Sequence, residues 1–272
     1  MKSIIRKIAV GAAVVLLTAC GTTSTVPITG RKHHLLVDDQ QVLSLSKQQY
    51  SDVLKQSKLS SNAANTAMVK RVGQRLATAV ETYLKQNGME GELKNFEWEF
   101  NLIVNNQVNA FCMPGGKIVV YEGILPVTQD EASLAIVLGH EIAHAVAKHS
   151  AEQMSKQMRQ QMGTSVLSGV VGQLAGQNAG SIASQVASSG FNFANLKYSR
   201  DNESEADHMG LIFAAMAGYD PQKAVAFWQR MAAQSSSNKS DLFSDHPSDA
   251  KRIAALEKEM PEAMKYYKPA KK

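Results

Sequence analysis

The segment LGHEIAHAVAKHS, residues 138–150, carries three histidines and a glutamate among residues that are otherwise mostly apolar. Such titratable groups are costly to bury unless they are paired or bound to a metal. On a helix, His140 and His144 lie one turn apart on the same face, so both imidazoles can bind one Zn²⁺ ion. Glu141 lies beside that face and can serve as the general base that activates a water. The pattern predicts a catalytic site with one Zn²⁺ per chain.

A catalytic zinc usually takes three protein ligands, so the third must come from another part of the chain. His149 lies about 180° around the helix from His140, and we expect it to face away from the metal at the end of the helix. Glu203 and Asp207 lie four residues apart on a second expected helix. Glu203 can complete a His, His, Glu set, and Asp207 can accept the free N–H of a zinc-bound histidine. Glu205 lies on the opposite side of that helix, where we expect it to face solvent.

The spacing of apolar residues predicts the elements that position these two motifs. A long amphipathic helix is expected over residues 62–84, and alternating apolar residues predict a strand over 96–104. A turn at 113–116 precedes a second strand over 117–121, whose edge could bind an extended peptide. The remaining expected helices run from residue 128 or 130 to about 149, and over 199–217, 221–234 and 247–260.

Residues 160–196 contain no charged side chain and are rich in Gly, Ser, Ala and Val. Polar residues interrupt this segment, so two helices of small residues packed as a hairpin are the favoured interpretation. A mobile lid over a cleft and a surface that touches lipid are the two alternatives.

The first twenty residues have the pattern of a secretory signal. A basic segment, MKSIIRK, precedes an apolar run of ten residues that is too short to span a bilayer as a helix. The tetrad LTAC that follows resembles a bacterial lipobox. This resemblance implies a lipoprotein signal peptide over 1–19, lipidation of Cys20 and, with Gly21 next, a location on the periplasmic side of the outer membrane. A plain secretory signal with an incidental cysteine is the alternative.

Composition sets the expected domain limits. Residues 20–34 are rich in Gly, Thr, Ser and Pro, which predicts a flexible tether; its lipidation at Cys20 is what the lipobox resemblance implies. A globular domain is expected over 35–262 and a solvated basic tail over 263–272. Without the signal peptide, 26 basic residues face 24 acidic ones, and no basic stripe predicts nucleic-acid binding. Cys112 is the only cysteine besides Cys20, so no internal disulfide is expected.

The two motifs and their surroundings resemble the M48 family of zinc metallopeptidases, in particular its bacterial lipoproteins. The matching segments are HEIAH at 140–144, ESEAD at 203–207, NAFCMPGGKIVVYEGIL at 109–125 and DHPSDAKRI at 245–253. The resemblance implies an α+β fold, namely a mostly helical zincin-type domain in which a small β-sheet edges the active-site cleft. It also implies that the substrates are polypeptides.

The same resemblance implies roles for His246 and Arg252. In similar proteins, a His-Pro segment and a downstream arginine lie near the cleft. His246 could stabilise the oxyanion of the reaction or occupy the open zinc position as a latch, and Arg252 could contact the substrate or the transition state. Taken without the resemblance, a His-Pro pair before a helix is more often a simple turn.

These features favour a zinc endopeptidase, anchored by lipid in the cell envelope, that degrades misfolded or damaged envelope proteins. The alternative is a chaperone-like outer-membrane assembly factor, with envelope assembly partners, whose zinc site is latched and rarely active. A purely structural zinc site is disfavoured, because closed structural sites usually use four protein ligands rich in Cys.

Overall fold

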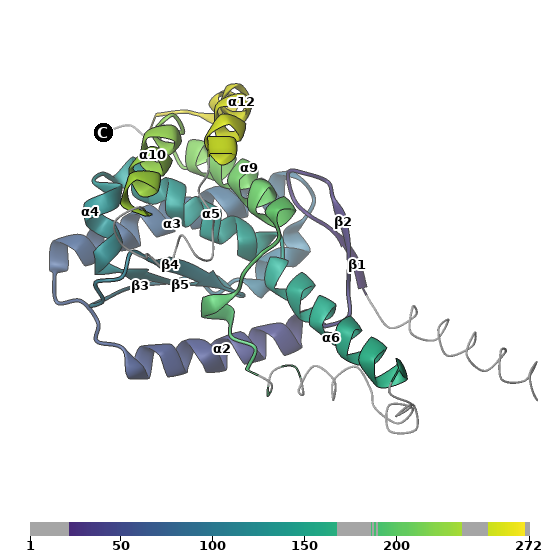
Figure 1. The fold of residues 1–272 in the computed structure, drawn as a ribbon. Coiled ribbons are helices and arrows are strands. Elements are labelled where there is room, and N and C mark those ends of the chain that lie inside the picture. The colour runs from purple at the N-terminus through teal and green to yellow at the C-terminus, as the bar shows by residue number, and fades with distance from the viewer. Residues whose placement is uncertain (1–21, 168–185, 187, 189, 236–249, 270–272) are drawn as a thin grey trace, which may run out of the picture.

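The structure is a computed structural model of the chain, and it describes residues 22–167, 186, 188, 190–235 and 250–269. Most of these residues are helical and the strands form two small sheets (Figure 1), which confirms the predicted α+β class. The helices are α2 (Asp39–Gln56), α3 (Ala63–Gln86), α4 (Leu125–Thr128), α5 (Glu131–Val146), α6 (His149–Leu167), α9 (Arg200–Met216), α10 (Lys223–Ser235) and α12 (Ala250–Tyr266). The strands are β1 (Thr22–Thr25), β2 (Lys32–Leu35), β3 (Glu99–Ile103), β4 (Ala110–Met113) and β5 (Lys117–Tyr121).

The larger sheet has the strand order β3-β5-β4, with β3 parallel and β4 antiparallel to β5. Both of its faces are buried. Ile118 and Val120 join a core formed with α3 and α5, whereas Val119 joins a second core formed with α2. Figure 1 shows α5 and α2 on opposite sides of this sheet. Because β5 is the central strand and is paired on both sides, the expectation that residues 117–121 offer a free edge to a peptide is wrong.

Residues 22–35 form an antiparallel hairpin of β1 and β2, so the flexible tether expected for 20–34 is wrong for this stretch. The Val26 amide donates a hydrogen bond to the Arg31 carbonyl across the turn, and the Val26 side chain is buried. Gly, Thr and Ser are common in linkers, which is why composition suggested a tether. Order comes instead from apolar burial and from the ion pair between Arg31 and Glu205.

Helix α5 is the buried centre of the fold. Asp130 caps it by accepting a hydrogen bond from the Ser133 amide. Residue 130 is one of the two positions at which the sequence predicts this helix to begin. Every residue from Ser133 to Val146 is buried, as in a helix that is covered by other elements on all sides. The helix ends at Val146, before the expected end near residue 149. Lys148 adopts a left-handed conformation with φ 56°, and the chain then continues as α6.

The other helices lie close to their predicted positions, with one extension. Asn62 caps α3 and Ser199 caps α9, at the residues where the sequence predicts these helices to begin. Helix α12 continues to Tyr266, so the first part of the tail expected at 263–272 is helical, and Ala263 is buried there.

The uncharged segment is only partly described. Helix α6 covers its beginning, and a 3₁₀ turn, η3 (Phe193–Asn195), lies near its end. Most of the hairpin or lid expected over 160–196 lies outside the described residues. In the part of the chain that the structure describes, no helix combines the length and apolar character needed to cross a bilayer.

Helices α5 and α9 touch backbone to backbone at a pair of glycines. A β-carbon on Gly139 would lie 2.8 Å from the Gly210 carbonyl oxygen, and one on Gly210 would lie 2.7 Å from the His140 amide nitrogen. Any side chain at these positions would push the helices apart. Because His140 follows Gly139 directly and Glu203 lies on α9, this contact sets the distance between the two motifs.

We predict that Gly210→Ala lowers the free energy of unfolding by about 1–3 kcal/mol, the usual cost of overpacking a tight contact. The variant should also bind Zn²⁺ more weakly, because the two motifs move apart. Urea denaturation and metal titration measure these effects. Gly91→Ala is the matched control, since a β-carbon there meets no atom within 4 Å. Equal stability of both variants would contradict the close helix contact.

Candidate metal centre

His140 and His144 project from α5 toward Glu203 on α9. The Nε2 atoms of the two histidines are 3.1 Å apart. Glu203 places Oε2 at 3.4 Å from Nε2 of His140 and Oε1 at 3.4 Å from Nε2 of His144. Ligand atoms around a tetrahedral Zn²⁺ at about 2.0–2.1 Å would lie about 3.3 Å from one another. The three side chains therefore form a His, His, Glu set of the right size for one Zn²⁺ ion, at the positions that the sequence predicts.

All three side chains are buried, with exposed fractions of 3% for His140, 1% for His144 and 7% for Glu203. Burial alone would lower the pKa of His140, but hydrogen bonds with Asp207 and Glu203 raise that pKa to about 9. The negative charges of the Asp207 and Glu203 carboxylates would also attract a metal cation. Burial lowers the pKa of His144 well below its usual value, so this imidazole is neutral and can bind a metal.

Asp207 contacts Nδ1 of His140, the ring nitrogen that does not face Glu203. Its Oδ1 atom lies 2.9 Å from Nδ1 of His140, which matches the role expected for this residue. Arg252 on α12 donates two hydrogen bonds to the Asp207 carboxylate, of 2.7 and 2.6 Å. Burial would raise the pKa of Asp207, but the Arg252 guanidinium and His140 lower it. Asp207 is therefore ionised and suited to accept a hydrogen bond from His140.

Arg252 is buried and also stacks on an aromatic ring. Its guanidinium carbon lies 3.5 Å from the centre of the Trp228 ring, a cation–π contact, and its Nη1 atom lies 3.7 Å from Glu203. The structure thus brings Arg252 into the site and engages it with Asp207. Sequence reasoning missed Trp228, because it lies within α10 and belongs to no recognisable motif.

Glu141 is buried beside the ligands, close to Cys112 on β4. Burial and the nearby Glu141 carboxylate raise the pKa of the Cys112 thiol. This thiol therefore stays protonated and is a poor nucleophile or metal ligand. His246 and Cys20 lie outside the described residues, so the roles expected for them remain predictions from the sequence.

Tyr198 is a further site residue that sequence reasoning missed. Its ring stacks on His144 with the centroids 4.1 Å apart and an interplanar angle of 20°. Its hydroxyl oxygen lies 2.9 Å from the Ser150 hydroxyl oxygen, and burial raises its pKa. The tyrosine fixes one face of the ligand ring. An aromatic residue just before the second motif helix is too weak a signal to predict this contact.

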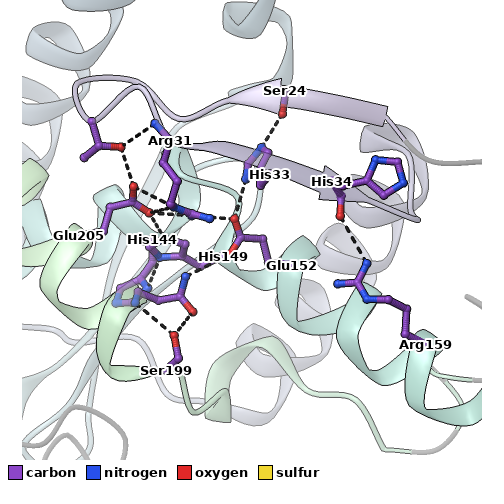
Figure 2. Close-up of polar contacts among 12 residues, drawn as sticks. Ser24, Arg31, His33, His34, His144, His149, Glu152, Arg159, Ser199 and Glu205 are labelled. Carbon is purple, nitrogen blue, oxygen red and sulfur yellow. Dashed lines mark hydrogen bonds and ion pairs between the residues drawn. The ribbon is translucent and has the colours of Figure 1, made fainter. Parts of the chain in front are cut away.

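Two expectations about neighbouring residues are wrong. The sequence pattern predicts that His149 faces away from the metal. The helix break at Lys148 instead places the Nδ1 atom of His149 2.8 Å from Nδ1 of His144. The pattern also predicts that Glu205 faces solvent. Glu205 is instead buried, contacts His149 and forms an ion pair with Arg31 (Figure 2). His149 stays outside the ligand set, as expected.

Comparison with known proteins gives relatives that carry peptidase names. The Mitochondrial metalloendopeptidase OMA1 of Schizosaccharomyces pombe is 35% identical over 174 residues, which cover 63% of this chain and 49% of the relative. The human Metalloendopeptidase OMA1, mitochondrial, is 28% identical over 248 residues, 88% of this chain and 46% of the relative. The Beta-barrel assembly-enhancing protease of Escherichia coli is 30% identical over 161 residues, 58% of this chain and 33% of the relative. The matches therefore span about half or less of these relatives' lengths.

The sequence model of peptidase family M48 matches residues 63–260. This range covers most of the chain and contains α5, α9, the larger sheet and Arg252. It therefore includes all three ligands of the metal centre and the residues that support His140. The chain belongs to peptidase family M48.

Proposed function

We propose that this chain is a zinc-dependent endopeptidase, anchored by lipid in the cell envelope, that degrades misfolded or damaged envelope proteins. The observation that carries the peptidase activity is the convergence of His140, His144 and Glu203 on one point. The names of the relatives, which are metalloendopeptidases and a protease, support the same activity. One Zn²⁺ per chain follows from one such ligand set within the described residues.

The residues around the ligands suit peptide-bond hydrolysis. His140, His144 and Glu203 would hold the Zn²⁺ ion, which would supply Lewis acidity toward a scissile carbonyl and the attacking water. Glu141 is next to His140 in the chain and buried beside the ligands; it takes the proton of the attacking water and passes it to the leaving amine. Asp207 accepts the hydrogen on Nδ1 of His140, so this ring keeps the tautomer whose Nε2, the nitrogen near Glu203, has its lone pair available for the metal.

We predict that Glu141→Gln lowers the rate of casein cleavage by about 10²–10⁴-fold, because the amide cannot take up the proton. Bound zinc, measured by atomic absorption, should stay at one ion per chain, because Glu141 is not a ligand. Removing zinc with a chelator should abolish cleavage in the wild type, and added Zn²⁺ should restore it. The exposed Glu97→Gln serves as the control. Full activity of Glu141→Gln would exclude this residue as the base.

Arg252 acts in this proposal by holding Asp207, and not by touching the substrate. Its planar fork makes two hydrogen bonds to Asp207 and stacks on Trp228, and a lysine can reproduce neither feature. We predict that Arg252→Lys weakens Zn²⁺ binding by about tenfold or more, as measured by competition with a chelator. Lys251→Arg, on the exposed side of α12, should bind zinc normally. Unchanged zinc affinity with a raised KM would instead assign Arg252 to substrate binding.

The proposed location rests on the sequence LTAC at residues 17–20. We predict that the wild type, produced in a Gram-negative host, incorporates labelled palmitate and fractionates with the outer membrane. Cys20→Ser should lose both the label and the membrane association, because no other thiol is available at the mature N-terminus. Cys112→Ser is the matched control and should keep the label, since Cys112 is buried. An unlabelled wild type would rule out the anchor.

The second candidate is an assembly factor whose zinc site is rarely active. It is favoured by the similarity to a relative named Beta-barrel assembly-enhancing protease. The Glu141→Gln variant separates the two candidates in cells that lack the wild-type chain. Restoration of the normal pattern of envelope proteins by this variant would favour assembly, whereas accumulation of uncleaved envelope proteins would favour proteolysis.

A further inference from the structure

The second ring nitrogen of His144 faces another histidine. His144 directs Nε2 toward Glu203, and its Nδ1 atom lies 2.8 Å from Nδ1 of His149. A neutral imidazole that binds a metal through Nε2 carries its hydrogen on Nδ1. In the metal-binding form, His144 must therefore donate this hydrogen, and Nδ1 of His149 is the acceptor within reach (Figure 2).

Glu205 selects the tautomer of His149 that can accept. The Nε2 atom of His149 lies 2.9 Å from Oε2 of Glu205. An ionised carboxylate can only accept hydrogen bonds, so Nε2 of His149 carries a hydrogen. In the tautomer whose one hydrogen lies on Nε2, Nδ1 of His149 has the lone pair that can accept from His144. The hydrogen bonds then run in one direction, from His144 to His149 to Glu205.

The N-terminal hairpin holds Glu205 in this position. Arg31 donates hydrogen bonds of 2.9 and 2.6 Å to Oε2 of Glu205, and the Thr29 hydroxyl donates one of 2.6 Å to Oε1. Arg31 also pairs with Glu152 on α6 at 2.7 Å. The charged Arg31 and the Thr29 hydroxyl stabilise the ionised form of Glu205 and fix its orientation toward His149.

We propose that His149 is a positioning residue for the metal ligand His144, and that Glu205 sets the tautomer that His149 needs for this role. The inference rests on the proposed zinc site. Each ligand histidine then has its own acceptor, since His140 uses Asp207 directly and His144 uses a histidine backed by a carboxylate. Partners of this kind fix the orientation of a ligand ring and raise its basicity.

The path of the backbone shows that this contact depends on a specific break in the helix. In an uninterrupted helix, His149 would lie about 180° from His140. The left-handed Lys148 instead ends α5 and places His149 at the start of α6, with its ring centroid 4.9 Å from that of His144. His149 is fully buried, and its two hydrogen-bond partners, His144 and Glu205, come from α5 and α9.

The first test measures the zinc affinity of the full-length chain in detergent by competition with a chromogenic chelator. His149→Phe keeps a ring but has no acceptor, and we expect it to bind Zn²⁺ about 10–100-fold more weakly than the wild type. His149→Asn keeps an oxygen acceptor near the position of Nδ1, and it should recover most of the loss. His33→Phe is the matched control, because His33 is also buried and also bound to a carboxylate, Glu152, but does not reach a ligand. It should bind zinc within about threefold of the wild type.

These measurements separate this inference from the function on which it rests. A wild-type chain that binds no stoichiometric zinc would overturn the proposed peptidase site itself. A wild-type chain that binds zinc with the same affinity as His149→Phe would overturn only the role of His149. An equal loss in His33→Phe and His149→Phe would also overturn it, because the effect would then come from general damage to the buried polar network.

The second test reads the protonation of the ring nitrogens in the wild-type chain, and a variant serves only to assign the signals. Nitrogen-15 NMR of histidine-labelled, zinc-loaded wild-type chain reports which ring nitrogen of each imidazole carries a hydrogen. We expect His149 to be protonated only on Nε2 and His144 only on Nδ1, with the His149 signals assigned by their absence from His149→Asn. A His149 ring protonated on Nδ1 would contradict the proposal, because two N–H groups would then face each other.

Discussion

Helices α5 and α9 pack with their backbones in contact where Gly139 meets Gly210, and the metal centre is built around that contact. Each helix contributes side chains to the same small volume: two imidazoles from α5 and one carboxylate from α9. A zinc site tolerates only small changes in ligand distance. Side chains larger than hydrogen at these two positions would push the helices apart, so the glycines help to set the distance between the ligands.

Burial gives this centre its chemical character. The ligands are buried, with only small fractions of their surface exposed, and an uncompensated charge in such a place is costly. The protein offsets this cost on both sides of the metal position. Arg252 pairs with Asp207, which contacts the ligand His140, and Arg31 pairs with Glu205, which contacts His149. The two supports come from opposite ends of the chain, which couples the folding of the termini to the geometry of the centre.

The sequence predicts the α+β class and the metal ligands well, because both depend on local spacing. HExxH and ExxxD place their residues on one helical face whenever the segment is helical, and both segments are. His149 and Glu205 were misjudged for the opposite reason. The angular argument for His149 assumed that α5 continues through Lys148, and Glu205 is buried by Arg31, a partner 174 residues away. The central position of β5 likewise depends on which strands pair, which periodicity does not encode.

The ordered hairpin changes what the proposed lipid on Cys20 would mean for the enzyme. Only Gly21 lies between that cysteine and β1, and two extended residues span about 7 Å. A flexible tether of fifteen residues would have let the catalytic domain move away from the membrane surface. With the hairpin docked on α9 through Arg31, the catalytic domain would instead sit against the lipid headgroups. Its substrates would then be polypeptides close to the membrane surface, such as chains that arrive at or emerge from the bilayer.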